Sequence, residues 1–184
     1  MAYTLEEFSA DCHRILKADP GAAGREQVRQ KLENLLLEDD FIAANCGPDA
    51  KGGANVLYAD AELGFQILAH IMDEGHEGGV HDHGASWAIY GQAVGHTDMT
   101  EWKRTDDGTA EGRASVEKDH TYRLERGQAG IFQDHKIHSI AYPAGARFIR
   151  VTGIDLQTIA RGRYDVAAGT MAMDKRPNFK GAAI

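Results

Sequence analysis

Cysteine is scarce in this chain, and its scarcity limits the possible fold classes. The 184 residues contain only two cysteines, Cys12 and Cys46. Two are too few for a disulfide framework, and neither belongs to a paired metal-binding motif. We expect both thiols to be buried structural residues. A reducing cytoplasm is the compartment that this cysteine usage favours.

Long apolar runs and an excess of basic charge are also lacking. No stretch approaches the roughly 20 apolar residues of a membrane-spanning helix, and the N-terminus is too acidic for a signal peptide. The sequence has 20 Lys and Arg against 28 Asp and Glu, a formal net charge of −8. This balance argues against a nucleic-acid or anionic-membrane surface and favours a soluble protein. The chain is long enough for one domain with a substantial core.

The first forty-odd residues have the periodicity of two helices. Thr4 can cap the first helix, with Glu7 completing a capping box. Apolar residues then recur at helical spacing until the Asp-Pro-Gly sequence at 19–21 ends the run. The second helix is predicted from Gly24 to Asp39. We expect residues 1–46 to form a helical extension packed against the barrel or a second subunit, so a homodimer is one possible assembly.

After residue 46 the sequence changes to short segments rich in β-branched and aromatic residues, separated by Gly, Asp and Asn. This pattern predicts an antiparallel sandwich or barrel over residues 47–160. The candidate strands are 55–58, 65–73, 79–83, 87–94, 96–103, 120–124, 130–132, 139–142 and 147–154. Residues 161–184 are predicted as a C-terminal tail of weak periodicity, for which disorder and packing across a dimer are both open.

Two histidines separated by one residue, His81 and His83, carry the strongest functional signal. Side chains of an extended segment alternate between faces, so both imidazoles would point to one side and Asp82 to the other. His138, in a second strand-like segment, is expected to complete a metal site, because neutral imidazole is the commonest ligand for iron, nickel, copper and zinc. His135 is the alternative third ligand, but its position is loop-like. The competing interpretation is ordinary surface or core histidines in a chain that has nine.

Segments 75–84 and 130–139 resemble the two sequence motifs of the cupin superfamily. In the first, a glycine-rich turn leads into His-x-His, and the second closes with the histidine at 138. Most cupins have a glutamate four or five residues after the second histidine, where this chain has Trp87 and Ala88. The resemblance implies a mainly β fold, the double-stranded β-helix or jelly-roll barrel. It also implies one metal ion, held here by three histidines without a carboxylate.

Within the cupins, residues 54–156 resemble the thiol dioxygenases, which act on cysteine and 3-mercaptopropionate. The match from 65 to 83 has no gaps, and the His-Asp-His-Gly-x-x-Trp order without the glutamate is typical of this branch. The Ser-x-His-x-Tyr relay of the family is absent, because its positions carry Phe148, Arg150 and Thr152. The arginine or glutamine that pairs with the substrate carboxylate has no counterpart in residues 54–58. Ala88 replaces the cross-linking cysteine of the animal enzymes.

The resemblance also implies which strand faces line the substrate cavity. His70 lies on such a face, where a histidine would be a general base or a substrate ligand. A hydrogen-bonded structural histidine is the alternative. Arg150 would enter from the opposite wall and bind a carboxylate, unless it forms a structural ion pair with an acidic residue. The remaining predicted pocket residues are Gln66, Met72, Tyr90 and Thr152.

Three neutral imidazoles would leave Fe(II) with its full charge and three open coordination positions, which suits an anionic chelating substrate together with O₂. We therefore predict a non-haem Fe(II) dioxygenase, with O₂ and a small anionic substrate as partners. The resemblance implies a thiol acid. One alternative is a lyase, isomerase or hydrolase that uses Zn²⁺, Ni²⁺ or Mn²⁺, with His70 as acid and base. Another is a small-molecule-binding protein without catalysis, since one barrel supports many functions.

Overall fold

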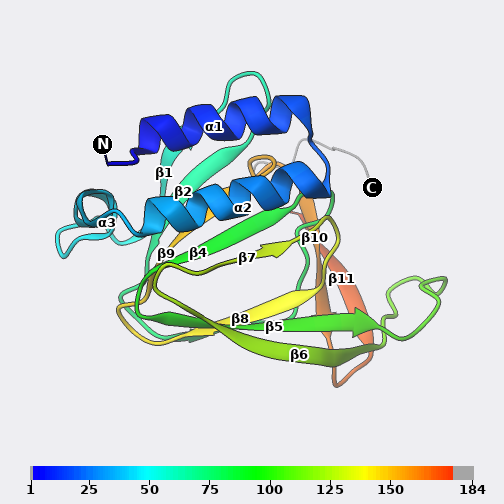
Figure 1. Ribbon diagram of the computed structural model, residues 1–184. Coiled ribbons are helices and arrows are strands. Elements are labelled where there is room, and N and C mark those ends of the chain that lie inside the picture. Colours follow the sequence, from blue (N-terminus) through cyan, green and yellow to red (C-terminus); the bar gives the residue numbers. More distant parts are fainter. Residues whose placement is uncertain (1, 176–184) are drawn as a thin grey trace.

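The computed structural model describes residues 2–175, which fold into three helices followed by eleven strands (Figure 1). The helices are α1 (Leu5–Ala18), α2 (Ala22–Leu36) and α3 (Asp39–Cys46). The predicted capping box is confirmed, because the Thr4 side chain accepts from the Glu7 amide and the Glu7 side chain accepts from the Thr4 amide. The third helix was not predicted. The chain leaves the helical conformation at Glu38, and two acidic residues then begin α3, where negative charge favours a helix N-terminus.

The strands agree with most of the predicted segments. They are β1 (Gly53–Ala59), β2 (Gln66–Ile71), β3 (His76–Glu77), β4 (Ala88–Val94), β5 (His96–Arg104), β6 (Val116–Glu125), β7 (Ala129–Phe132), β8 (His138–Tyr142), β9 (Arg147–Thr152), β10 (Ala160–Asp165) and β11 (Thr170–Lys175).

Two antiparallel sheets face each other and form the barrel. One has the order β1-β2-β9-β4-β7 and the other β3-β8-β5-β6. Buried side chains from both sheets meet between them and include Tyr90 of β4, Met99 of β5 and Phe148 of β9. The predicted fold class is confirmed: the chain is mainly β, with antiparallel sheets in a jelly-roll arrangement and helices at the N-terminus.

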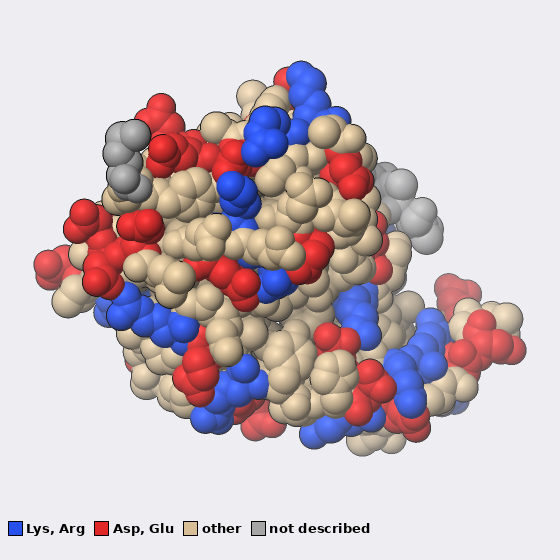
Figure 2. Space-filling view, viewed as in Figure 1, with Lys and Arg blue, Asp and Glu red and all other residues tan. Residues whose placement is uncertain are grey.

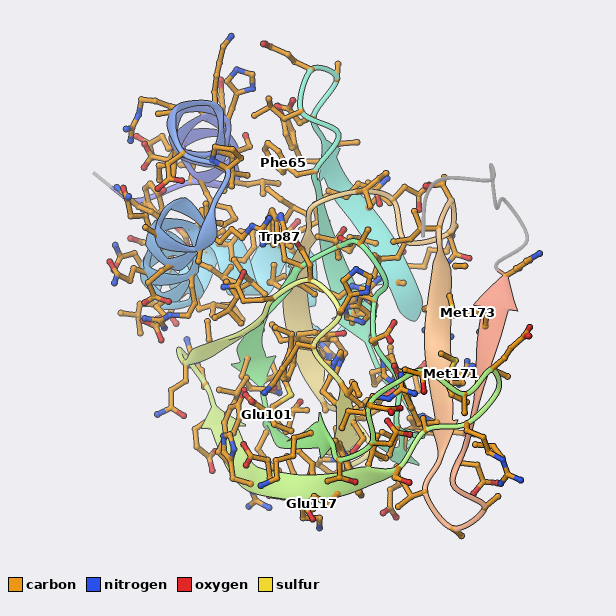
Figure 3. All side chains as sticks on the ribbon, turned by 90° about the vertical axis from the view of Figure 1, so that its right-hand side faces the viewer. Phe65, Trp87, Glu101, Glu117, Met171 and Met173 are labelled. Carbon is orange, nitrogen blue, oxygen red and sulfur yellow. The ribbon has the colours of Figure 1, made fainter. Side chains whose placement is uncertain are left out.

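The helices cover the outer face of the five-stranded sheet (Figure 1). Their apolar stripes and the outward side chains of the sheet form one buried cluster, which contains both cysteines, as expected. Figure 3 shows Phe65 and Trp87 on the side of the barrel that faces the helices, whereas Met171 and Met173 lie on the hairpin at the opposite side. The helical layer therefore leaves the interior of the barrel free for a site.

Gly91 of β4 lets α2 approach the sheet closely. A Cβ atom at this position would lie 2.6 Å from Leu36 Cδ1 and 2.7 Å from Leu32 Cδ2. Gly91→Ala is therefore expected to lower the free energy of unfolding by about 1–3 kcal/mol, the usual cost of overpacking a core. Urea denaturation measures the change. Gly79→Ala is the control, since a Cβ there meets nothing within 4 Å; equal stability of the two variants would contradict close packing of α2.

Two elements differ from the sequence prediction. His81 forms only an isolated bridge and residues 82–83 belong to no strand, because pairing in this segment is limited to single bridges with β8 and β10. The side chains of residues 81–83 nevertheless alternate in direction, with His81 and His83 on one side and Asp82 on the other. The predicted C-terminal tail begins inside β10, and residues 160–175 form the β10–β11 hairpin. Its strands pair with each other, and only single bridges join them to segments distant in sequence, from Arg163 to His81 and from Thr170 to Arg113. Residues 176–184 of that predicted tail lie outside the described residues.

The surface in Figure 2 has carboxylates gathered toward the α3 end of the helical layer, while lysines and arginines are interspersed over this face. No basic patch dominates the face shown, in agreement with the net charge of −8. Within residues 2–175, no helix combines the length and the apolar composition needed to cross a bilayer.

Candidate metal centre

The three predicted histidine ligands lie together. His81 and His83 come from the segment before β4, and His138 is the first residue of β8. Their potential ligand atoms all lie within 4.8 Å of one another. The ring centroids are 4.5 Å apart for His81 and His138, and 4.7 Å apart for His83 and His138. Reciprocal backbone hydrogen bonds of 2.9 and 2.8 Å between His81 and His138 fix two of the rings relative to each other.

The ring nitrogens are arranged as a metal centre requires. The Nδ1 of His81 donates to the Gly79 carbonyl at 2.8 Å, and the Nδ1 of His138 donates to the Lys136 carbonyl at 3.1 Å. Metal-bound imidazoles commonly donate their second ring N–H in this way, which leaves Nε2 for the metal. The Nε2 of His138 and the Nδ1 of His83 are buried without a hydrogen-bond partner. The three residues therefore fit a mononuclear metal ion with imidazole ligands.

The residue between the two histidines anchors the segment that carries them. Asp82 is 5% exposed, and its carboxylate accepts hydrogen bonds from the Gly84 amide (2.8 Å), the Gly162 amide (2.8 Å) and the Tyr164 hydroxyl (2.7 Å). A Cβ at Gly162 would lie 2.5 Å from Asp82 Oδ2, so a larger residue at this position would displace the carboxylate. The Asp82 carboxylate therefore points away from the histidine cluster and fastens β10 to the metal-binding segment.

A cavity of about 210 Å³ adjoins the histidine cluster, and His81 is part of its lining. This volume is below the range of about 300–1,000 Å³ of typical drug-sized ligand sites, so a small ligand fits it. Four predicted pocket and catalytic residues line the cavity: His70, Met72, Tyr90 and Arg150. The Tyr90 hydroxyl lies 3.3 Å from His83 Nε2. A polar hydroxyl group therefore lies beside the cluster, although the Ser-His-Tyr relay of the thiol dioxygenases is absent from β9.

Gln66 and Thr152 do not line this cavity. They face each other across β2 and β9, two register pairs beyond Leu68 and Arg150. Thr152 is fully buried, and its hydroxyl donates to the Ile154 carbonyl at 2.9 Å. The alternation of side chains places both residues on the inner face, but it cannot show where along the barrel the cavity ends. Their prediction as pocket residues is therefore wrong for this cavity.

The two predicted catalytic residues have unsatisfied polar atoms in the cavity wall. The Nε atom of Arg150 and the Nε2 atom of His70 are buried without hydrogen-bond partners. The His70 ring stacks on Phe148 with 4.7 Å between centroids and 8° between planes. No carboxylate within residues 2–175 forms an ion pair with Arg150, which removes the alternative of a structural ion pair for the described part of the chain. Both side chains are available to a ligand.

His135, the alternative third ligand, lies apart from the cluster. It is exposed and has a φ of 59°, a left-handed backbone conformation that fits a loop residue. His138, in contrast, is fully buried and stacks on Phe132, with 3.9 Å between ring centroids and 7° between planes. The pairing of His138 with His81 therefore places His138 in the cluster, whereas His135, three residues earlier, lies in a loop.

Burial lowers the pKa of four histidines, and the positive charge of nearby arginines lowers each of these pKa values further. The four are His70, His81, His83 and His138. The pKa of His138 falls to about 3. Each of the four is therefore neutral at pH 7, and a neutral imidazole is the form that binds a metal.

These lowered pKa values predict that the metal-free protein loses stability as pH falls. Below about pH 6.5 the unfolded chain binds protons at these histidines and the folded chain does not, so acid favours unfolding. Each histidine contributes up to about 1.4 kcal/mol per pH unit to the slope of the free energy of unfolding against pH. Urea denaturation between pH 6.5 and 5 measures the slope. His70→Gln is expected to reduce it, because the lowered pKa of His70 contributes to the slope; a flat profile for the unmodified protein would contradict the lowered pKa values.

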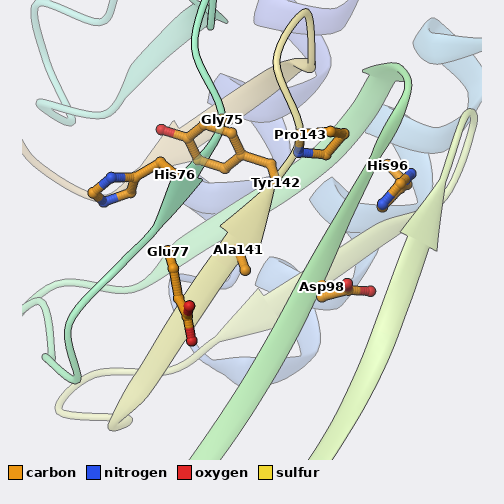
Figure 4. A pocket seen from close by; sticks show the side chains of 8 residues that line it. All are labelled: Gly75, His76, Glu77, His96, Asp98, Ala141, Tyr142 and Pro143. Atoms are coloured by element: carbon orange, nitrogen blue, oxygen red, sulfur yellow. The ribbon is translucent and has the colours of Figure 1, made fainter.

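A second hollow of about 350 Å³ shares His76 and Tyr142 with the cavity (Figure 4). The two rings lie side by side in this view, with centroids 5.7 Å apart. Asp98, which also lines the hollow, forms a two-pronged ion pair with Arg123 at 2.7 and 2.9 Å. Its carboxylate is thus already paired, and this hollow, unlike the first cavity, has no arginine in its lining.

Sequence reasoning missed two further cavity residues, Arg161 and Arg163 of β10. Both lie in the segment predicted as a tail. The available signal was the Arg-Gly-Arg-Tyr alternation at 161–164, which places both arginines on one face of a strand and Gly162 and Tyr164 on the other. His13, for which no partner was predicted, contacts Asp60 at 2.8 Å and joins α1 to the loop after β1. That contact is structural.

Comparison with known proteins gives a likeness of fold. No family model matches the chain, and no curated protein matches its sequence. The cupin domain of Cnp3 from Schizosaccharomyces pombe is 14% identical with a TM-score of 0.42, over 59% of this chain and 66% of that one. KdgF from Halomonas sp. is 16% identical with a TM-score of 0.39, over 54% and 74%.

A cupin superfamily protein from Desulfitobacterium hafniense is 15% identical with a TM-score of 0.40, over 60% of this chain and 86% of that one. The match to the Cnp3 domain covers slightly less than two thirds of that chain's own length. At these low identities the likeness concerns the fold alone, and the three-histidine cluster is seen in the chain's own geometry.

Proposed function

We propose that this protein is a mononuclear non-haem Fe(II) dioxygenase that oxidises a small anionic thiol acid. The observation that carries the proposal is a three-imidazole cluster without a carboxylate, next to a small cavity in which the unpaired guanidinium of Arg150 lies. The overall reaction adds both atoms of O₂ to the substrate sulfur, so a thiol R–SH and O₂ give a sulfinic acid R–SO₂H. When bound, Fe(II) supplies the coordination positions at which thiolate and O₂ meet.

The chain's own residues orient the substrate. Arg150 binds the carboxylate of the thiol acid, since a guanidinium donates two parallel hydrogen bonds to a carboxylate. This contact fixes where the thiol end lies, and holding reactants at contact distance is itself a large part of catalysis. His70 is neutral and unpartnered at Nε2, and we assign it the role of a hydrogen-bond partner or base for the substrate.

Oxygen consumption by the Fe(II)-loaded protein tests the proposal. We expect uptake with at least one member of a panel of thiol acids, in a 1:1 ratio with the sulfinic acid formed. Cysteine, 3-mercaptopropionate and mercaptosuccinate form the panel. Uptake that is absent with every thiol acid, in protein whose iron content is one per chain, would contradict the dioxygenase.

Arg150→Gln is expected to reduce kcat/KM for the thiol acid at least about 30-fold, because truncating one partner of a buried charge pair costs about 2–5 kcal/mol. Most of the loss is expected in KM, since the guanidinium binds the substrate away from the sulfur. Steady-state oxygen uptake separates kcat from KM. Arg126→Gln, at an exposed arginine paired with Asp39, is the control. An unchanged KM in Arg150→Gln would remove this arginine from the substrate site.

A second candidate keeps the metal centre without oxygen activation. The buried neutral His70 in the cavity wall favours it, because such a group can move a proton on a substrate bound beside Zn²⁺, Ni²⁺ or Mn²⁺. A lyase, isomerase or hydrolase of this kind would act without consuming O₂. Turnover of an anionic substrate under anaerobic conditions, lost in His70→Gln, would favour this second candidate over the dioxygenase.

A further inference from the structure

The cavity beside the histidine cluster has an apolar wall that the binding of a carboxylate does not explain. Its aromatic residues contact one another, with the ring centroid of Phe148 lying 5.8 Å from that of Tyr90 and 5.7 Å from that of Tyr142. The side chains of Ile140 and Met72 extend this wall. The hydroxyl groups of both tyrosines already have hydrogen-bond partners. The wall therefore presents an apolar surface to a ligand.

The apolar wall and Arg150 lie at different levels of the barrel. Arg150 and Phe148 are two residues apart on β9 and both line the cavity, and Phe148 is paired with His70 of β2. Met72 follows His70 by two residues, and its amide donates to the Ala146 carbonyl at 3.0 Å. Met72 thus lies four residues beyond the level of Arg150, about 13 Å at the usual rise of a strand. The cavity therefore has a charged end and an apolar end.

Met72 helps to close the apolar end. Met72, His76 and Tyr142 line the cavity, and the same three side chains line a separate hollow of about 340 Å³. Side chains that border two hollows lie between them. The Tyr142 hydroxyl donates to the Met72 Sδ at 3.1 Å, and the rings of His76 and Tyr142 lie side by side (Figure 4). The contact with Tyr142 holds the flexible methionine in this position.

We infer that the substrate is an acid with an apolar chain, which runs from its carboxylate at Arg150 along Phe148, and that Met72 sets the longest chain that fits. The inference rests on the proposed function and specifies its substrate class as a thiol acid with an alkyl chain. Each methylene group that the wall buries strengthens binding. The gain ends where the chain meets Met72, because a packed wall resists additional atoms.

A series of unbranched carboxylates from propionate to nonanoate tests the inference. Isothermal titration of the Zn²⁺-loaded protein measures their binding without turnover. We expect the affinity to rise about fourfold with each methylene, the effect of burying one such group, up to a limiting length and to fall beyond it. Equal affinity for every member of the series would overturn the inference of an apolar end.

Met72→Ala is expected to lengthen this limit by about three chain atoms, because it removes the Cγ, Sδ and Cε atoms of the closing side chain. Met72→Phe is expected to shorten the limit. Met173→Ala, at a methionine of β11 that is 49% exposed, is the matched control and is expected to keep the limit of the unmodified protein. Urea denaturation checks that each variant is folded. An unchanged limit in a folded Met72→Ala or Met72→Phe variant would overturn the role of Met72.

The outcomes separate this inference from the proposed function. Binding that depends on chain length and shifts in Met72→Ala, without oxygen uptake on any thiol acid, would support the apolar end and contradict the dioxygenase. Oxygen uptake with a thiol acid, together with binding that is independent of chain length, would support the dioxygenase and overturn the inference.

Discussion

His138→Ala is expected to bind a divalent metal more than about 100-fold more weakly than the unmodified protein. Loss of a residue that merely orients a metal ligand costs about 10–100-fold in affinity, so loss of a ligand costs more. With two imidazoles left, oxygen uptake is expected to fall to the background of free iron. Competition titration with a chelating dye measures the affinity, and an oxygen electrode measures the uptake.

Two variants distinguish loss of the ligand from loss of the fold. His138 stacks on Phe132 and is fully buried, so alanine also leaves a space in the core. His138→Gln keeps most of the volume and is expected to lose the metal while remaining folded. His135→Ala, three residues away and exposed, is expected to bind metal like the unmodified protein. Unchanged affinity in a folded His138→Gln variant would contradict the three-histidine site.

Asp82→Ala is expected to lower the free energy of unfolding by about 3–5 kcal/mol. The carboxylate accepts from two buried donors, the amides of Gly84 and Gly162, and from the half-buried hydroxyl of Tyr164. Each buried donor left without an acceptor costs about 1–3 kcal/mol. The metal affinity is expected to fall about 10–100-fold as well, because the β10 strand that supports His81 is released. Urea denaturation of the metal-free protein and a metal titration measure the two effects separately.

Tyr164→Phe is the matched control for Asp82, since it removes one donor and leaves the carboxylate and both amide contacts in place. We expect it to cost about 1 kcal/mol, the net contribution of a typical hydrogen bond, with little change in metal affinity. If Asp82→Ala were no less stable than Tyr164→Phe, the hairpin would not depend on this carboxylate, and its role as the anchor of the metal-binding segment would be wrong.

Much of the fold could be predicted because its signals are local. The Thr4–Glu7 capping box and the apolar spacing of α1 identify that helix from adjacent residues alone. The strands of the two sheets are short runs bounded by turn residues. The docking of the β10–β11 hairpin on the metal-binding segment could not be predicted in this way, because it joins Asp82 to Gly162, eighty positions apart in the sequence. The residue pattern within 161–175 does not indicate a contact with Asp82.

The metal ligands could be predicted, but the cavity could be predicted only in part. His81 and His83 are two residues apart, so alternation places them on one side even where the segment forms no regular strand. The same alternation places Gln66 and Thr152 on the inner face, yet it does not specify their depth along the barrel. Part of the positive charge of the cavity comes from Arg161 and Arg163. Their contribution cannot be predicted without knowing where the β10–β11 hairpin lies.

Anomalous X-ray diffraction from crystals grown with Zn²⁺ or, without oxygen, Fe(II) tests the metal centre most directly. The geometry predicts one dominant peak between His81, His83 and His138, with zinc–nitrogen distances of about 2.0–2.1 Å. A second group of potential ligands, Glu101, Asp119 and His120, lies at the surface and is expected to remain without a comparable peak. A crystal with metal only at that surface group, or with none among the three histidines, would contradict the metal centre and the function proposed from it.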